Sequence, residues 1–164
     1  MDAPSATAAA GGAGRHGDVL LARPADLVRG RGAAARACAR SAQAGRVVAS
    51  SRAVRVEIDG VLLAESRRPL LLFETTLPVR YYLPPDDVQI ELVRSQTRSV
   101  CPYKGVATWW SGRIGDRVAE DIAWSYPSPV PENPRIAGLI CFRNERVDLT
   151  VDGQRLERPV TPWS

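Results

Sequence analysis

Two Asp-Gly pairs limit the folds open to this chain. Each stands between two strand-like runs: residues 54–58 and 61–65 surround Asp59-Gly60, and residues 146–151 and 154–156 surround Asp152-Gly153. A two-residue Asp-Gly loop between such runs is the strongest short-range sign of a β-hairpin, because both central residues of the turn need a positive φ. The sequence therefore predicts one hairpin near each end of the region that follows residue 45.

The segment between the two hairpins also has the texture of an all-β domain. Short runs rich in β-branched and aromatic residues alternate with proline-containing gaps, which is typical of a sheet-based fold. We expect strands at Leu70–Glu74, Val79–Leu83, Val88–Val93, Lys104–Ile114, Arg117–Trp124 and Leu139–Phe142. Pro84-Pro85-Asp86-Asp87 predicts one short helical turn, with proline at its start. The fold class is mostly β, with at most short helical turns.

The first 45 residues differ in composition from the rest. They are rich in Ala, Gly and Arg and contain no Phe, Trp, Tyr or Ile, so they cannot bury enough apolar surface to offset the entropy lost on ordering. We interpret residues 1–45 as a disordered tail and residues 46–164 as a single domain. The tail holds six arginines against three aspartates, whereas the domain holds 16 basic and 15 acidic residues. A nucleic-acid footprint needs a basic surface, so the folded domain is not expected to bind nucleic acid.

Location and metal content follow from the same composition. No apolar run approaches the roughly 18 residues that span a bilayer, and the N-terminus has no secretory pattern, so we expect a cytoplasmic protein without a membrane partner. Its three cysteines, Cys38, Cys101 and Cys141, are an odd and widely spaced set, and its one histidine is His16. Because a zinc site needs close sets of N and S ligands, we predict no metal site.

One segment, residues 97–110, gathers the residues with most chemical potential. Lys104 is the one lysine in a chain that otherwise uses arginine, and lysine differs from arginine in being a compact ammonium whose proton is more readily lost on burial. It is either a residue with a specific role or a chance surface lysine. Cys101, three residues away, is either a nucleophile assisted by the Lys104 charge or a small hydrophobic residue at the start of a strand.

Aromatic residues suggest a pocket. Trp124 and Tyr126 share one face of an extended segment, and Tyr82 and Trp110 lie in other predicted strands. Together they would form the aromatic wall of a pocket for a flat or cationic ligand, or simply pack in the core. The charges of Glu74 and Arg80 would serve as polar anchors of that pocket, or would pair with each other across a turn.

The same residues resemble a known family. The resemblance lies in Glu74 with Leu77-Pro78 and Arg80-Tyr81-Tyr82-Leu83-Pro84, in Asp87-Val88, in Thr97 with Cys101-Pro102-Tyr103-Lys104-Gly105 and Ala107, in Ala123-Trp124 with Tyr126 and Pro129, and in Ile136 with Gly138 and Phe142. Over residues 46–158 the chain is similar to the bacterial and fungal family called domain of unknown function 427.

This resemblance implies a β-tent fold, in which two antiparallel sheets lean together at one edge. Similar tents in other families hold ligands in aromatic cages and often carry zinc on paired cysteines, which this chain lacks. A nucleotidyltransferase label attached to the family implies an enzyme. Residues 46–164 contain no phosphate-binding glycine loop. Asp86 and Asp87 are adjacent, so in a strand their carboxylates would face opposite sides, which is a poor arrangement for holding Mg²⁺.

Three hypotheses of function follow. The first is the binding of a small ligand, without a cofactor, by Glu74, Arg80, Tyr82, Cys101, Tyr103, Lys104, Trp110, Trp124 and Tyr126. The second is a nucleotidyltransferase acting on a nucleoside triphosphate, in which Lys104 would neutralise phosphate charge and Glu74 or Asp87 would hold Mg²⁺. The third is a module that binds a protein partner through exposed aromatic residues.

Overall fold

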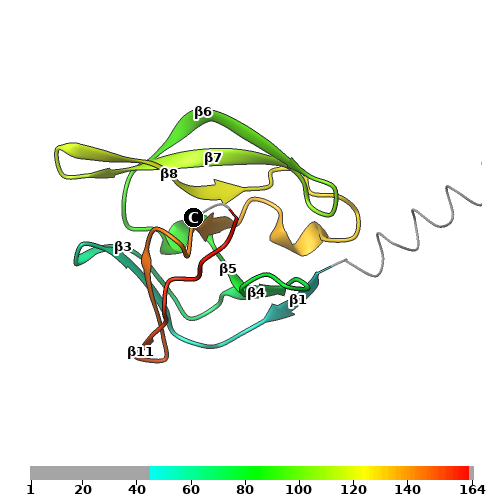
Figure 1. Cartoon of the computed structure of the whole chain (residues 1–164), viewed down its shortest axis with the longest axis horizontal. Helices are drawn as coiled ribbons and strands as arrows, with labels where there is room; N and C mark the ends of the chain where they lie inside the picture. The colour runs from blue at the N-terminus through cyan, green and yellow to red at the C-terminus, as the bar shows by residue number, and fades with distance from the viewer. Residues whose placement is uncertain (1–44, 163–164) are drawn as a thin grey trace, which may run out of the picture. The chain divides into compact units, whose positions relative to one another are not determined.

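The computed structural model describes residues 45–162, and the predicted disordered tail lies outside these residues apart from its last one. Within the described part, seven strands form one antiparallel sheet: β1 (Arg46–Ala49), β4 (Leu70–Phe73), β5 (Arg80–Leu83), β9 (Ile140–Phe142), β8 (Arg117–Ser125), β7 (Gly105–Ile114) and β6 (Leu92–Cys101), in that spatial order. Four more form a second sheet: β11 (Gln154–Arg155), β10 (Asp148–Val151), β2 (Val54–Ile58) and β3 (Val61–Ser66). The predicted mostly-β fold with two antiparallel sheets is confirmed (Figure 1).

Both predicted hairpins are confirmed. Strand β2 pairs with β3, and β10 pairs with β11. The turn residues have the positive φ that the Asp-Gly pattern requires: 49° and 78° at Asp59 and Gly60, and 51° and 82° at Asp152 and Gly153. The expected helical turn is a 3₁₀ turn, η1 (Pro85–Asp87), and a second one, η2 (Pro134–Ile136), follows β8.

One predicted strand was misplaced, and one observed strand was missed. The strand expected at Val88–Val93 begins only at Leu92 and continues to Cys101, and β1 was not predicted at all. Strand β6 lies at an edge of the large sheet and is exposed along most of its length, so its side chains show no apolar alternation to detect. An edge strand need not have a buried face. The alternation of apolar and polar residues is therefore a poor indicator of such a strand.

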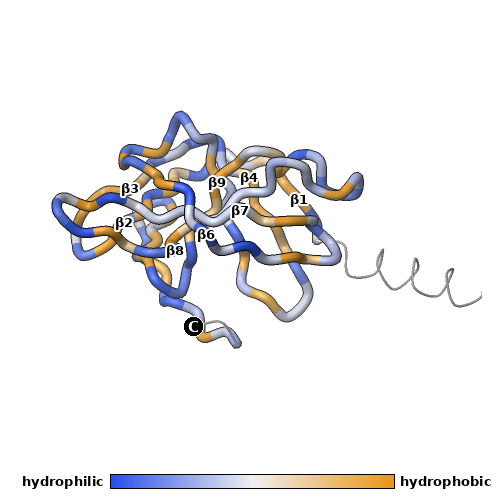
Figure 2. Tube along the Cα trace, turned by 90° about the horizontal axis from the view of Figure 1, so that it is seen from above, coloured by the Kyte–Doolittle hydropathy of each residue, from blue (hydrophilic) through white to orange (hydrophobic). Residues whose placement is uncertain are grey.

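Each face of the large sheet carries a cluster of buried apolar residues. One face packs against the small sheet in a core that includes Tyr81, Ile122 and Phe142. The other face carries a second apolar cluster around Tyr82 and Cys141. Neighbouring residues therefore enter different clusters, as the alternation of side chains along a strand requires. In Figure 2 the hydrophobic stretches of β3, β4 and β9 lie toward the middle of the domain and the hydrophilic turns at its rim.

The turn from β6 to β7 depends on Gly105. This residue has φ of +105°, and an added Cβ would lie 3.2 Å from the carbonyl oxygen of Ser128. We expect Gly105→Ala to lower the free energy of unfolding by about 2–3 kcal/mol, because both the backbone conformation and the close contact oppose a side chain. Urea denaturation measures this loss.

Gly115→Ala is the matched control. Gly115 also has a positive φ, +58°, but nothing lies within 4 Å of its added Cβ. That substitution should cost only about 1 kcal/mol. An equal loss in the two variants would show that the contact with Ser128 does not constrain the turn.

Candidate functional site

A row of side chains crosses the large sheet on the face that points away from the small sheet. Trp109 of β7 is paired with Trp124 of β8, Trp124 with Cys141 of β9, and Cys141 with Tyr82 of β5. Directly opposed residues of antiparallel strands point to the same side. The register of four strands, which no local sequence pattern specifies, thus assembles one continuous aromatic surface.

Two breaks in strand pairing open the sheet beside this surface. Between Arg94 and Arg98, β6 loses register with β7, and β8 loses register with β7 near Asp121. Asp121 has φ of +49°. It is held by a hydrogen bond from the Thr97 hydroxyl to its Oδ2, 2.7 Å long. The irregularities of β6 and β8 therefore contact each other across β7, and bulges of this kind bend a sheet.

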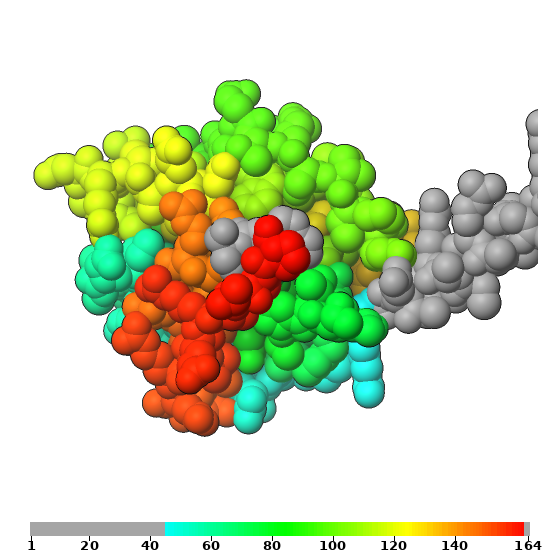
Figure 3. Space-filling model, in the orientation of Figure 1, coloured from blue at the N-terminus to red at the C-terminus, as the bar shows by residue number. Residues whose placement is uncertain are grey.

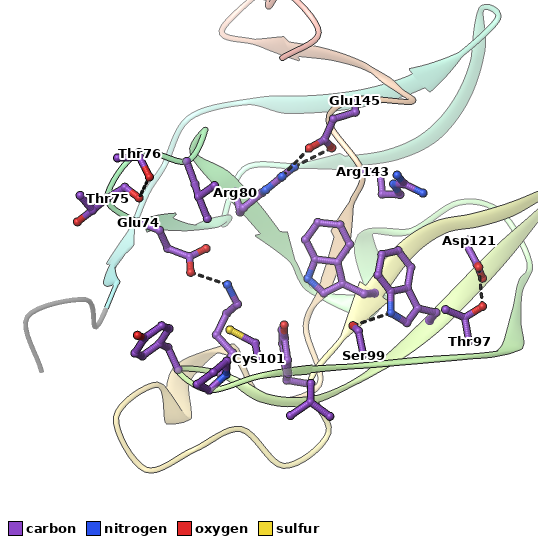
Figure 4. Close-up of a pocket in the computed structure, with 18 residues that line it drawn as sticks. Glu74, Thr75, Thr76, Arg80, Thr97, Ser99, Cys101, Asp121, Arg143 and Glu145 are labelled. Carbon is purple, nitrogen blue, oxygen red and sulfur yellow. Dashed lines mark hydrogen bonds and ion pairs between the residues drawn. The ribbon is translucent and has the colours of Figure 1, made fainter. Parts of the chain in front are cut away.

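The Trp109–Trp124 end of this surface is the floor of a cavity of about 680 Å³. In Figure 4, Glu74 and Cys101 lie at one side of this cavity and Thr97 and Asp121 at the other, with Arg80 directed toward Glu145. The lining comes from four strands, β5 to β8, from the turn between β6 and β7, and from the segments that follow β4, β8 and β9. Its residues are Glu74, Thr75, Thr76, Leu77, Arg80, Thr97, Ser99, Val100, Cys101, Pro102, Tyr103, Lys104, Trp109, Asp121, Trp124, Tyr126, Arg143 and Glu145. Its size lies within the range of small-molecule pockets.

Lys104 forms one of two buried ion pairs in the pocket. Its Nζ lies 2.5 Å from Oε1 of Glu74, and the two side chains are only 11% and 9% exposed. The turn that holds Lys104 is tied to the loop that follows β8, because the Val130 amide donates to the Lys104 carbonyl oxygen at 3.1 Å. Asn133 donates to the carbonyl oxygen of Tyr103 at 2.8 Å. Lys104 is thus a buried residue, and the alternative of a chance surface lysine was wrong.

Arg80 and Glu145 form the second pair. The Arg80 guanidinium donates two hydrogen bonds to Glu145, of 2.9 and 2.6 Å, and the side chains are 7% and 3% exposed. Burial by itself would raise the pKa of the Glu145 carboxyl. The hydrogen bonds from Arg80, from the backbone and from Thr161, together with the Arg80 charge, outweigh this effect and hold that pKa at about 2. The Thr161 hydroxyl also donates to Glu145. The C-terminal segment, red in Figure 3, lies over this part of the domain.

Both pocket indoles carry an arginine over the ring. The Arg80 guanidinium lies 5.3 Å from the centroid of Trp124, and that of Arg143 lies 5.7 Å from Trp109. The two indoles are 5.4 Å apart and tilted by 52°. Their ring nitrogens are also used, since Trp109 donates to Ser99 at 2.9 Å and Trp124 donates to the Tyr82 hydroxyl at 3.3 Å. These contacts hold the aromatic wall in one arrangement.

The structure brings most of the sequence-predicted site residues to this pocket. Its lining includes Glu74, Arg80, Cys101, Tyr103, Lys104, Trp124 and Tyr126. The cross-turn ion pair between Glu74 and Arg80 was wrong, because each side chain pairs with another partner.

Two predicted residues do not line the cavity. Tyr82 is fully buried behind Trp124. Trp110 lies on the opposite face of β7, against the core between the sheets, where its ring nitrogen donates to Ser125. The physical reason is the alternation of side chains, which sends Trp109 into the pocket and its neighbour away from it.

The pocket residues that sequence reasoning missed include Trp109, Arg143 and Glu145. Trp109 could not be distinguished from Trp110 without the register of β7 with β8. Arg143 and Glu145 follow Cys141 at intervals of two residues. If the predicted strand had been continued beyond Phe142, this spacing would have placed all three side chains on the same side. Cys141 itself is inert in this setting, because burial raises the pKa of its thiol to about 12.

Over residues 45–162, no group of three or more His, Cys, Asp or Glu side chains gathers where it could hold a metal ion. No helix in this part of the chain is long and apolar enough to cross a bilayer.

The chain matches the sequence model of a protein family. Residues 46–153 match the family model described as domain of unknown function (DUF427), whose short label is NTP_transf_9. Among curated proteins, no match was found. The matched range covers every strand that contributes to the pocket.

Proposed function

This chain belongs to the family described as domain of unknown function DUF427, and we propose that its β domain binds a small organic molecule in the aromatic pocket. The observation that carries the proposal is a cavity of about 680 Å³ whose floor is the Trp109–Trp124 pair and whose polar groups include two buried ion pairs. Concave, largely apolar sites with a few well-placed polar groups are typical of small-molecule binding.

The two buried ion pairs are a poor way to stabilise the fold, and we infer that they have a role beyond folding. Burying an ion pair gains little over packed apolar side chains, because desolvation offsets the attraction between the charges. Here Lys104–Glu74 and Arg80–Glu145 both border the same cavity. Charged groups that are already desolvated and held in place can contact a ligand without the cost of ordering them.

A thermal-shift screen of the whole chain against metabolites, heterocycles and Mg²⁺–nucleotides tests the proposal. A ligand at about 100 times its Kd adds about 2.7 kcal/mol to the free energy of unfolding, which is a shift of several degrees for a domain of this size. Turnover of a nucleoside triphosphate with Mg²⁺ would favour the transferase hypothesis instead. A library without any hit would favour a protein partner. A cytoplasmic location stays a prediction from the sequence.

Two tryptophan variants locate any binding that the screen finds. We expect Trp124→Leu to weaken the affinity for a hit by at least about tenfold, since contact of an aromatic side chain with a ring is worth roughly 0.5–1.5 kcal/mol beyond the area that it buries. Isothermal titration calorimetry measures the change. Trp110→Leu is the control, because Trp110 lies on the other face of the sheet and is also partly buried.

The control variant should bind as the unmodified chain does, despite a comparable loss of stability. If Trp110→Leu weakens binding and Trp124→Leu does not, the ligand binds somewhere other than this pocket.

A further inference from the structure

The charges of the pocket cancel one another. Among the described residues that line it, three are cationic and three are acidic: Arg80, Lys104, Arg143, Glu74, Asp121 and Glu145. Two of the cations lie in nearly fully buried ion pairs with two of the acids. A ligand therefore meets paired charges rather than an excess of one sign.

An anionic ligand would disturb these pairs. To contact a phosphate or carboxylate directly, Lys104 would have to leave Glu74, or Arg80 would have to leave Glu145. Otherwise the cation would have to share its charge between its carboxylate partner and the ligand. The abandoned carboxylate would then be buried without a counter-ion, which is far more costly than an intact pair. The pairing thus disfavours anions at Lys104 and Arg80, two of the three cations that line the pocket.

A cationic ligand is disfavoured for a different reason. Aromatic pockets attract cations through the electron-rich faces of their rings. Here the Trp124 ring already lies under the Arg80 guanidinium and the Trp109 ring under that of Arg143. A second cation at either ring would meet the charge of the arginine.

Hydrogen-bonding capacity remains at the Lys104–Glu74 pair. An ammonium has three N–H donors and a carboxylate about four acceptor positions, whereas the contact between the two residues uses one of each. A donor and an acceptor thus stand side by side at the edge of the cavity, 2.5 Å apart. An amide-type ring edge, with a carbonyl oxygen next to an N–H, is the complement of that arrangement.

We propose that the pocket selects uncharged planar rings with an amide-type edge, whose carbonyl accepts from Lys104 and whose N–H donates to Glu74. This inference rests on the proposed ligand-binding function and gives the chemical class of its ligand. The ring lies among Trp124, Tyr126 and Trp109, and the two ion pairs stay intact while it is bound.

Four probes built on one bicyclic ring test the proposal by calorimetry with the whole chain. Quinolin-2-one is neutral and has the amide edge, N-methylquinolin-2-one lacks the N–H, quinoline-2-carboxylate is an anion and N-methylquinolinium is a cation. We expect quinolin-2-one to bind at least about tenfold tighter than each of the other three, since a lost hydrogen bond to a charged group is worth about that factor or more. Trp124→Leu should weaken this binding.

The outcomes separate this inference from the proposed function. Tightest binding by the carboxylate or the quinolinium, with loss of that binding in Trp124→Leu, would overturn the neutral-ligand inference and leave a ligand-binding pocket. Equal binding of quinolin-2-one and its N-methyl form would overturn the amide-edge contact. A full library without hits, including these four probes, would overturn the proposed function and this inference together.

Discussion

Replacing Arg80 by methionine is expected to lower the free energy of unfolding by about 3–5 kcal/mol, because it leaves a buried carboxylate without its counter-ion. Glu145 is 3% exposed and receives two hydrogen bonds from Arg80. Methionine fills much of the same space but returns no charge and no donor, so Glu145 must either stay ionised at high cost or take up a proton. Urea denaturation measures the loss, which corresponds to a fall in melting temperature of roughly 10 °C or more.

Two comparisons make this expectation specific. Arg52→Met breaks the pair with Asp152, whose side chains are 58% and 50% exposed, and should cost under about 1 kcal/mol because solvent screens such pairs. The double variant Arg80→Met/Glu145→Leu removes both buried charges and should recover most of the stability lost in the single variant. A loss in Arg80→Met no larger than that in Arg52→Met would show that the buried pair contributes little.

Acid should destabilise the domain through Glu145. The pKa of this carboxyl is about 2 in the folded protein against an ordinary value of 4.5. Burial raises it, but the hydrogen bonds and charge of Arg80, a backbone hydrogen bond and the Thr161 hydroxyl together outweigh burial. A group whose folded pKa is depressed contributes stability that is present above its unfolded pKa and lost as the pH falls through the folded pKa. We therefore expect about 3 kcal/mol of stability to disappear between pH 4.5 and 2.

A Glu145→Gln variant isolates this contribution. Other acids add to the pH dependence, since hydrogen bonds from Arg68 lower the pKa of Asp87. Glutamine does not titrate, so the difference in unfolding free energy between the unmodified chain and the variant should shrink by about 3 kcal/mol as the pH falls from 5 to 2. A difference that stays constant over this range would mean that Glu145 does not have a depressed pKa.

Much of the fold could be predicted because it depends on local chemistry. The two Asp-Gly turns need residues that accept positive φ, and such residues are visible in the sequence. Strands β7 and β8 each contain several β-branched and aromatic residues and were placed within one residue of their observed ends. Strand β6 was misplaced because, at the edge of the sheet, it has no buried face to impose a pattern.

The candidate site was predictable only in part. Lys104 could be singled out by composition alone, and seven of the nine predicted residues line the cavity. Their partners could not be foreseen. Glu145 lies 65 positions from Arg80, and Glu74 lies 30 positions from Lys104, so these pairs exist only after distant strands have come together.

The sequence by itself determined that the region beyond residue 45 forms antiparallel strands and carries aromatic and charged residues suited to a pocket. Only the tertiary structure decided which of those residues meet. The register of β7 with β8 sends Trp109 into the cavity and Trp110 into the core. The reason is that side chains alternate with a period of two along a strand, so a shift of one residue in pairing exchanges the two faces. That register is set by contacts across the whole sheet, which no local segment specifies.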